Sequence, residues 1–284
     1  MTGPRLLNVS PSSLGTWLDC PRAYRLRYLD RPRPAPAPQR AVVSIGNTAH
    51  AALSRFWELD VPDRVPRRVA ELVGAHWQSA GFRDRAQTDH WRPIVTGWVI
   101  DYLRGMDRTA DPLAVERTVA MPADGLAVQG RVDRLDERDG ELVVVDYKTG
   151  RHPPAPDAAR TSLALGLYAL AVSRMWRRPC SRVELHHVPS QTVQAHRHTE
   201  TSAARKLAEA ESIGAELREA LAAHAGDGAD AGAFPARPSA LCRWCAVQQH
   251  CAEGLQVGAA HPGWAGLEAL EASGQSPVED ASAP

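Results

Sequence analysis

Lysine is almost missing from this chain of 284 residues. Lysine and arginine together number 33, yet only Lys148 and Lys206 are lysines. The guanidinium group of arginine stays protonated, whereas the pKa of a lysine can be tuned by its neighbours. The common interpretation that a position simply needs some basic side chain therefore fails at Lys148. This residue becomes a candidate for chemistry.

Long apolar runs are missing too. No run approaches the roughly 20 residues that span a bilayer, and residues 1–5 are not followed by the apolar core of an export signal. We therefore expect a cytoplasmic protein with no membrane partner. The sequence also lacks a Gly-rich phosphate loop that ends in Gly-Lys-Ser/Thr, so the chain is not expected to power its own movement along a substrate.

Charge is balanced and cysteine is scarce. A formal net charge of zero argues against nonspecific coating of nucleic acid, but not against a local basic groove. Five cysteines in a cytoplasmic chain do not indicate a disulfide framework. Cys242, Cys245 and Cys251 stand close enough in the sequence for their thiolates to bind one metal centre. Cys180 is expected to be a small buried residue.

The N-terminal part of the chain is expected to be helical. Ser10 and Pro11 have the residue types that begin a helix, and Pro21 breaks that helix. The proline-rich segment 31–38 is expected to be an extended connector. Apolar residues at helical spacing then predict a helical part over about 44–106.

Residues of about 113–222 are expected to form the core of the domain. The apolar period there changes from helical to alternating, and glycines supply turns. Hairpins and one helical crossover would give an α/β fold, a mixed central sheet flanked by helices. We expect residues 1–254 to form a single domain and residues 255–284 to be a disordered tail. The predicted strands cover 115–121, 126–135, 141–148, 183–188 and 192–199, and the predicted helices of the core cover 158–176 and 202–222.

Asp146-Tyr147-Lys148, at the end of an apolar run, is the most informative motif. A strand sends alternate side chains to opposite faces, so Asp146 and Lys148 share one face and Tyr147 points away. If the strand pairs with the preceding one around residues 137–140, Asp133 comes close to Asp146. Two carboxylates would then hold a divalent cation beside an ammonium group, a set that can orient water against a phosphodiester. An ordinary surface ion pair is the competing interpretation.

Several motifs together resemble one family. These are the Ser13-x6-Cys20-Pro21 stretch, Gly46 to His50, Gly130 to Arg134, and Asp146 to Gly150. Their order resembles the PD-(D/E)XK nuclease superfamily, and the split cysteine pattern is similar to RecB-type exonucleases that carry an iron–sulfur cluster. That group includes the AddB nuclease domain and CRISPR-adaptation nucleases. The resemblance spans roughly residues 10–254 and implies a restriction-endonuclease-like fold.

The resemblance also implies roles for particular residues. His50, Asp133, Asp146 and the backbone carbonyl of Tyr147 would bind Mg²⁺ or Mn²⁺. Lys148 would position or activate the attacking water, and Tyr168 would help to hold the site or the DNA. The implied ligands of a four-iron four-sulfur cluster are Cys20, Cys242, Cys245 and Cys251. Four thiolates would suit zinc as well, and the sequence itself leaves that alternative open.

The implied activity is metal-dependent hydrolysis of DNA, expected to be exonucleolytic on single strands or free ends, in DNA repair or recombination with a helicase or repair partner. One position departs from the family. Ala164 stands one helical turn before Tyr168, where the family usually has glutamine, and a methyl group makes no hydrogen bond. Thr161 or Ser162 could substitute for it. Ala164 also motivates the alternative of a non-catalytic DNA-binding or scaffolding protein with the same fold.

Other polar residues are expected to have ordinary roles. Glu116 is either a second carboxylate behind the metal ligands or an exposed strand residue, and we favour the exposed residue. His186 and His187 are adjacent in a predicted strand, so at most one faces the site. His196 and His198 share a strand face that is expected to be solvated.

Overall fold

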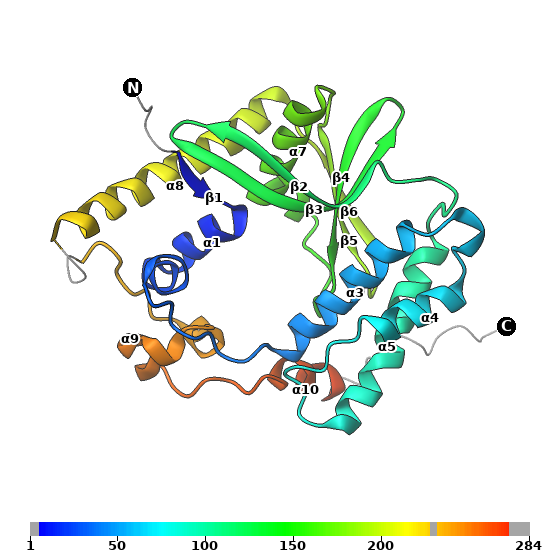
Figure 1. Cartoon of the computed structure of the whole chain (residues 1–284), viewed down its shortest axis with the longest axis horizontal. Coiled ribbons are helices and arrows are strands. Elements are labelled where there is room, and N and C mark those ends of the chain that lie inside the picture. The colour runs from blue at the N-terminus through cyan, green and yellow to red at the C-terminus, as the bar shows by residue number, and fades with distance from the viewer. Residues whose placement is uncertain (1–5, 228–231, 273–284) are drawn as a thin grey trace.

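The computed structural model describes residues 6–227 and 232–272 of the chain. Its centre is a six-stranded mixed sheet with helices on both faces, as Figure 1 shows. The α/β fold class that the sequence predicted is therefore confirmed. The strands are β1 (Leu7–Val9), β2 (Ala114–Ala123), β3 (Leu126–Arg138), β4 (Glu141–Lys148), β5 (Arg182–His187) and β6 (Thr192–Arg197).

Strands β2, β3 and β4 form two consecutive hairpins. β2 pairs antiparallel with β3, and β3 pairs antiparallel with β4. The turn between β3 and β4 consists of Asp139 and Gly140, both with positive φ, at 50° and 80°. This two-residue Asp-Gly turn matches the right-handed twist of the flanking strands. It fixes the register that brings the end of β4 back beside the middle of β3.

A helical crossover leads from β4 to β5, which pair in parallel. The crossover consists of α6 (Ala158–Thr161) and α7 (Leu163–Trp176). The sequence predicted one continuous helix here. The chain breaks at Ser162, whose hydroxyl oxygen accepts a hydrogen bond from the amide of Leu165 and so caps α7. β5 then pairs antiparallel with the edge strand β6.

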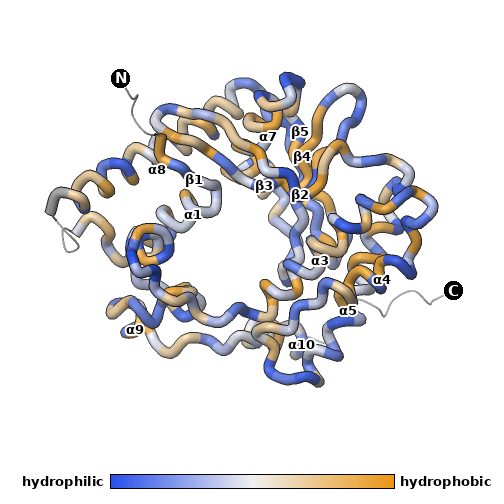
Figure 2. Tube along the Cα trace, viewed as in Figure 1, coloured by the Kyte–Doolittle hydropathy of each residue, from blue (hydrophilic) through white to orange (hydrophobic). Residues whose placement is uncertain are grey.

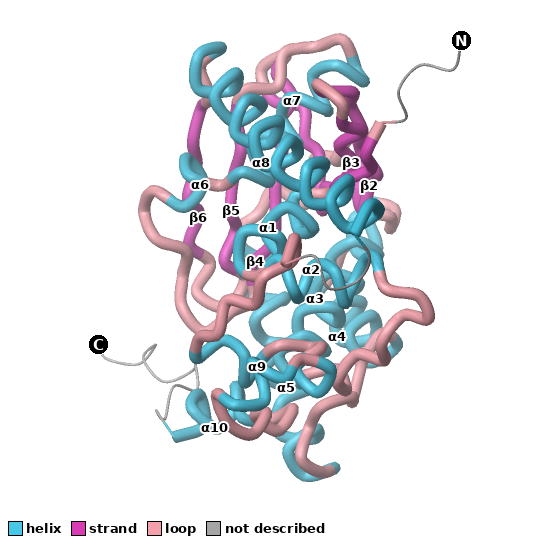
Figure 3. The backbone as a smooth tube through the Cα atoms, turned by 90° about the vertical axis from the view of Figure 1, so that its left-hand side faces the viewer, coloured by secondary structure: helices cyan, strands magenta, loops and turns pink. Residues whose placement is uncertain are grey.

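Two groups of helices cover the two faces of the sheet. The face with α7 also carries α1 (Pro11–Asp19) and the long helix α8 (Glu200–Asp227), which lie together in front of the strands in Figure 3. The opposite face carries α3 (Ala41–Trp57), α4 (Pro66–Ala75) and α5 (Arg85–Arg104). Among the residues that the structure describes, none of the helices has the length and apolar character that crossing a bilayer requires.

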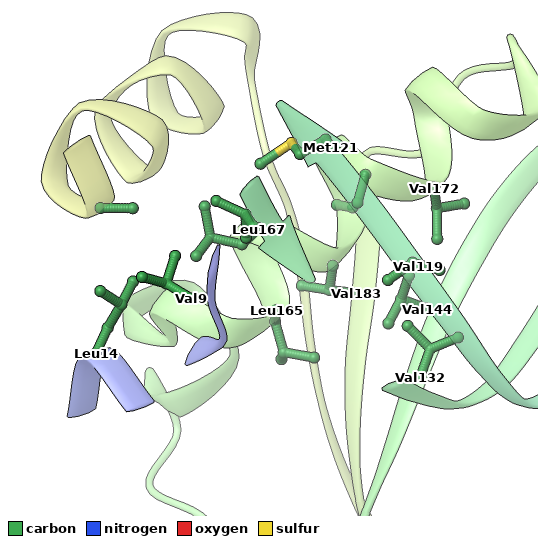
Figure 4. Packing of buried hydrophobic residues seen from close by; sticks show 14 of the residues in the cluster. Val9, Leu14, Val119, Met121, Val132, Val144, Leu165, Leu167, Val172 and Val183 are labelled. Carbon is green, nitrogen blue, oxygen red and sulfur yellow. The ribbon is translucent and has the colours of Figure 1, made fainter. Parts of the chain in front are cut away.

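The strands divide their side chains between two apolar cores. Leu142 and Val144 of β4 belong to the core beneath α7, whereas Val143, Val145 and Tyr147 belong to the core beneath α3 and α5. Figure 4 shows strand valines pointing toward apolar residues of α7. Apolar stretches follow the strands of the sheet in Figure 2 as well. The alternation at residues 142–147 leaves Asp146 and Lys148 on the side of α7.

The N-terminal helices meet the C-terminal segment away from the sheet. α2 (Pro21–Tyr24) continues into the π-helical turn Arg25–Leu29, and the chain then runs through the proline-rich connector. The amide of Ala37 donates to the carbonyl of Ala246, and the amide of Ala41 to that of Gly263. The connector and the C-terminal segment therefore lie side by side, as Figure 1 shows near α9 (Ala252–Gln256). Two short turns, Ala240–Trp244 and Gln248–His250, precede α9.

Two parts of the fold differ from the expectations. β1 was not predicted, and it adds to β3 in parallel. Residues 255–272 were expected to be disordered, but they include α10 (Ala265–Ala272), which packs on α3. Leu267 is fully buried there, and the carboxylate of Glu271 accepts a hydrogen bond from Trp91. One buried leucine and a few polar contacts suffice for this order; the sequence marks Leu267 and Trp264 as residues able to pack, but its composition there favours disorder. Residues 273–284 of the predicted tail lie outside the described residues.

Candidate active site

Asp146 and Lys148 form a close pair at the end of β4. The ammonium nitrogen Nζ of Lys148 lies 2.5 Å from Oδ2 of Asp146. The Asp146 side chain is mostly buried, whereas the Lys148 side chain is 48% exposed. The two residues share a strand face, as the sequence predicted, and the ring of Tyr147 points into the opposite core. A half-exposed amine can therefore reach a substrate while it contacts a shielded carboxylate.

Asp133 lies where the pairing of β3 with β4 stops. The last paired residues toward this end are Arg134 and Val145, so Asp133 and Asp146 occupy the next positions on the two strands. Oδ2 of Asp133 accepts a hydrogen bond of 2.7 Å from the backbone amide of Tyr147. The charge of Asp133 also acts on the pKa of Asp146. The strand pairing that the sequence predicted thus brings the two carboxylates together.

His50 reaches the same place from helix α3. Its Nδ1 lies 3.4 Å from Oδ1 of Asp133, and its ring packs edge-on against Tyr147 at 5.8 Å between centroids. Burial lowers the pKa of His50, but the hydrogen bond and charge of Asp133, together with the other nearby carboxylates, raise it overall. A Cβ atom on Gly46 would lie 3.2 Å from the Thr149 hydroxyl, so glycine lets α3 approach the end of β4.

Glu116 joins His50, Asp133 and Asp146 in what we call the acidic group, contrary to the interpretation favoured from the sequence. In β2, Val115 pairs with Arg134 and Arg117 with Val132, so Glu116 lies opposite Asp133, where the regular pairing of β2 with β3 is interrupted and Glu116 has φ of 48°. Its carboxylate pairs with Arg131 at 2.5 Å. Burial and the charge of Asp133 raise the pKa of Glu116 despite Arg131. Nothing in the residue alternation marks this interruption of the pairing.

Tyr168 lies over β3, where the strand has no side chain. A Cβ atom built on Gly130 would be 2.3 Å from the Tyr168 ring, so only glycine allows this packing. Burial, and then the charges of Asp146 and Asp133, raise the pKa of Tyr168 to about 12, although the backbone of Arg131 hydrogen-bonds it. Tyr168 is therefore a neutral hydroxyl beside the acidic group.

The two hydroxyls near Ala164 make local helix contacts. Ala164 is half-buried on α7. The Ser162 hydroxyl caps that helix, and the Thr161 hydroxyl hydrogen-bonds the backbone carbonyl of Asp157. Both hydroxyls that the sequence suggested as replacements are thus engaged in local helix contacts.

The acidic group fits a divalent cation. One atom each of His50, Glu116 and Asp133 lie within 4.8 Å of one another. Oδ2 of Asp146 is buried and contacts Lys148, yet no group offers it a hydrogen bond of good geometry. Burial and the charge of Asp133 raise the pKa of Asp146, although Lys148 and His50 act against them. Crowded carboxylates of this kind are relieved by a bound cation. Oxygen donors suit Mg²⁺, and one imidazole admits Mn²⁺.

Four of the five cysteines line one pocket between α2 and the C-terminal segment. They are Cys20, Cys242, Cys245 and Cys251, whereas Cys180 is buried in the core beneath α7. Burial raises the pKa of Cys245, to which the Cys20 and Cys242 thiols also contribute. Among the described residues, no three of these thiols lie within 4.8 Å of one another. Sulfurs around tetrahedral zinc would be about 3.8 Å apart, given Zn–S bonds of about 2.3 Å.

Four histidines near the last two strands contact groups other than the candidate metal ligands. His186 is buried between Tyr102 and Glu184, and His187 hydrogen-bonds the carbonyl of Gly150. The ring of His196 on the edge strand β6 contacts that of His198, which follows the strand, at 4.7 Å between centroids. His198 is buried, contrary to the expectation of a solvated face. None of the four belongs to a potential metal-binding group of three within the part of the chain that the structure describes.

Comparison with known proteins places this geometry in a family. Over 201 residues, 61% of this chain and 71% of the other, the chain is 28% identical to the Gene 69 protein of Mycobacterium phage D29. It is 41% identical over 56 residues to a CRISPR-associated exonuclease Cas4/endonuclease Cas1 fusion of Myxococcus xanthus (strain DK1622), which is 18% of this chain and 10% of that protein.

Among solved structures, a candidate exonuclease of Eubacterium rectale aligns with a TM-score of 0.46 and 10% identity, over 85% of this chain and 86% of that one. The family model of the PD-(D/E)XK nuclease superfamily matches residues 8–252. That match covers the sheet, the acidic group and all four cysteines of the pocket. The chain belongs to the PD-(D/E)XK nuclease superfamily.

Proposed function

We propose that this chain is a divalent-metal-dependent deoxyribonuclease that acts on single-stranded DNA or on DNA ends. The observation that carries the proposal is the meeting of His50, Glu116, Asp133 and Asp146 beside Lys148. Members of this superfamily use divalent metals. We further propose that the protein works as an exonuclease in the cytoplasm, in DNA repair or recombination. A separate helicase would supply movement along DNA.

The metal would be held by the carboxylates of Asp133 and Asp146, the imidazole of His50 and the backbone carbonyl of Tyr147. Glu116 adds a carboxylate that the sequence had not favoured. A bound Mg²⁺ or Mn²⁺ supplies a Lewis acid that activates water for in-line attack and offsets the charge that develops on the phosphate. His50 needs a free nitrogen lone pair for this role, so its neutral form would bind the metal.

Lys148 and Tyr168 would act on the substrate. Lys148 is exposed enough to contact a phosphate oxygen, and its pairing with Asp146 keeps the ammonium group at the site. It would orient the attacking water and stabilise charge on the phosphate. The neutral hydroxyl of Tyr168 would donate a hydrogen bond to the DNA backbone or to the site.

Substrate choice is tested by digestion of labelled DNA. We expect linear single strands and linear duplex ends to be degraded with Mg²⁺ or Mn²⁺, and closed circular DNA to survive. Chelation of the metal should abolish cleavage of every substrate. Cleavage of closed circles at the rate of linear DNA would contradict the exonuclease proposal while leaving a nuclease in place.

We also propose that the four pocket cysteines hold a four-iron four-sulfur cluster. The proposal is supported by the pocket that the four cysteines share. A cluster here would tie α2 to the C-terminal segment, closing a loop of more than two hundred residues. Protein purified without oxygen should be brown and contain iron. A colourless protein that contains zinc would contradict the cluster and favour the zinc alternative.

Ala164 favours a second candidate function. With the family glutamine absent and nearby hydroxyls engaged elsewhere, one polar contact to substrate is missing. A non-catalytic DNA-binding or scaffolding protein would still use the fold. Salt-sensitive DNA binding without metal-dependent cleavage would identify this alternative. Ala164→Gln should raise the cleavage rate of a weakened nuclease and should leave a non-catalytic protein without cleavage, which separates the two.

A further inference from the structure

Arg134 is a buried charge directly beneath the acidic group. It follows Asp133 on β3, and only 1% of its surface is exposed. Removing a guanidinium from water is costly unless it is paired and hydrogen-bonded. Its Nη2 donates a hydrogen bond of 3.0 Å to Asp136. An arginine kept at such a position needs a reason beyond filling space, because a well-packed apolar residue would often be at least as stable.

The guanidinium joins four structural elements. Its Nη1 lies 3.3 Å from the Tyr147 hydroxyl on β4 and 3.4 Å from the Tyr102 hydroxyl on α5. The charged group also lies over the indole of Trp57 on α3, at 5.0 Å from the ring centroid. The Trp57 indole nitrogen in turn donates to the Tyr147 hydroxyl at 3.2 Å. Arg134 therefore stands where α3, β3, β4 and α5 meet.

The network continues to the next strand of the sheet. The Tyr102 hydroxyl hydrogen-bonds Nδ1 of His186 at 2.7 Å, and Nε2 of His186 hydrogen-bonds Glu184 at 2.8 Å. Arg138 on β3 also pairs with Glu184, at 2.9 Å. These bonds are buried, so they fix geometry more firmly than surface contacts do.

Three elements of the network, α3, β3 and β4, also carry residues of the candidate site. Trp57 lies seven residues after His50, two turns along the same face of α3. Tyr147 follows Asp146, and its backbone amide holds Asp133. The His50 ring itself packs on the Tyr147 ring. Fixing Trp57, Arg134 and Tyr147 to one another thus fixes the helix relative to both strands.

We propose that Arg134 is a positioning residue: its guanidinium sets the distance between the imidazole carried by the helix and the carboxylates carried by the strands. The inference rests on the proposed function, because it assumes that these groups bind a divalent cation. Residues behind metal ligands typically change metal affinity by about 10–100-fold when they are replaced.

The test measures Mn²⁺ binding directly, by titration of the full-length protein without DNA, below the melting temperature of every variant. Arg134→Met removes the guanidinium group but leaves Asp136 paired with Arg138, at 2.6 Å. We expect Mn²⁺ affinity to fall about 10–100-fold. The maximal rate of DNA cleavage should fall with it, with KM for DNA little changed, and added Mn²⁺ should restore part of the rate. Arg178→Met, which breaks an exposed pair with Glu137, is the matched control and should bind Mn²⁺ as the wild type does.

Tyr147→Phe is the second variant for the Mn²⁺ titration, to be used if Arg134→Met does not fold. It deletes the hydroxyl that accepts from Arg134 and Trp57 but keeps the ring and the backbone amide. We expect about tenfold weaker Mn²⁺ binding. Wild-type affinity in every folded variant of this pair would overturn the role of Arg134. Wild-type protein that binds no Mn²⁺ would instead overturn the metal site itself, and this role with it.

Discussion

The backbone amide of Tyr147 donates a hydrogen bond of 2.7 Å to Oδ2 of Asp133. This bond joins the middle of β3 to the end of β4, where their regular pairing has already stopped. It uses one oxygen of Asp133 and leaves the other facing His50. The orientation of Asp133 is therefore set by the strand that carries Asp146, so the two carboxylates cannot move independently.

Lys148 should not be replaceable by arginine. Arginine keeps the charge, but its planar group is larger than an ammonium and does not exchange a proton at ordinary pH. We expect Lys148→Arg to lower the rate of DNA cleavage by about 100-fold or more, within the range for a positioned acid or base. Steady-state cleavage with Mn²⁺ and a melting curve of each variant would check this. Substantial activity in Lys148→Arg would show that charge alone is needed there.

Gly130 should be needed for Tyr168 to lie over the sheet. A methyl group there would overlap the ring, at 2.3 Å, and would push Tyr168 away from Asp146 and Asp133. We expect Gly130→Ala to cost about 1–3 kcal/mol of unfolding free energy and to reduce cleavage. Gly97→Ala is the control, because Gly97 is helical and no atom lies within 4 Å of its added methyl. The control should gain up to about 1 kcal/mol; equal effects of the two changes would contradict the packing argument.

Acid should destabilise the fold through Glu184. Burial alone would raise the pKa of Glu184, but the hydrogen bond with His186 and the charge of Arg138 lower it to about 2. The folded state therefore binds this proton less readily than the unfolded chain. The resulting stability, about 3 kcal/mol, is present above pH 4.5 and is lost as pH falls from about 4.5 to about 2.

Denaturant unfolding across this pH range measures the effect. Glu184→Gln should be less stable than wild type at neutral pH and should lose less stability between pH 4.5 and pH 2. Glu137→Gln is the matched change in an exposed carboxylate and should follow the wild-type profile. A wild-type slope in Glu184→Gln would show that other groups cause the acid sensitivity.

Loss of one pocket cysteine should act on the fold before it acts on catalysis. Cys245 lines the pocket between α2 and the C-terminal segment. A group bound in this pocket would restrain a very long loop of the unfolded chain. We expect Cys245→Ala to lower the melting temperature by several degrees, with cleavage per folded molecule largely kept. Cys180→Ala, in the separate core, is the comparison for losing a buried thiol without losing a ligand. An unchanged melting curve for Cys245→Ala would show that no group bound by the cysteines ties α2 to the C-terminal segment.

Local sequence predicted the central hairpin well. The predicted bounds of β4, residues 141–148, are those observed, because a continuous run of apolar, mostly β-branched residues and an Asp-Gly turn both favour the same strand. The shared face of Asp146 and Lys148 follows from the strand period alone. Burial of Cys180 was also predicted correctly.

Features that depend on distant contacts were missed. Glu116 joins the site because it lies opposite Asp133 in the register of β2 with β3 and has a positive φ, which neither strand shows alone. Arg134 looks like any charged residue of a strand, and only the tyrosines and Trp57 from other elements explain its burial. The helix α10 forms in a composition typical of disorder because Leu267 reaches the core of α3 and α5.

The account is tested most directly by Asp146→Asn, which replaces one oxygen by an amide and keeps the size of the side chain. Wild-type protein should degrade end-labelled single-stranded DNA in the presence of Mn²⁺. The variant should melt at a similar temperature and should cleave at least about 100-fold more slowly, because one anionic donor and the partner of Lys148 are both lost. Equal cleavage by the two proteins would contradict the proposed site.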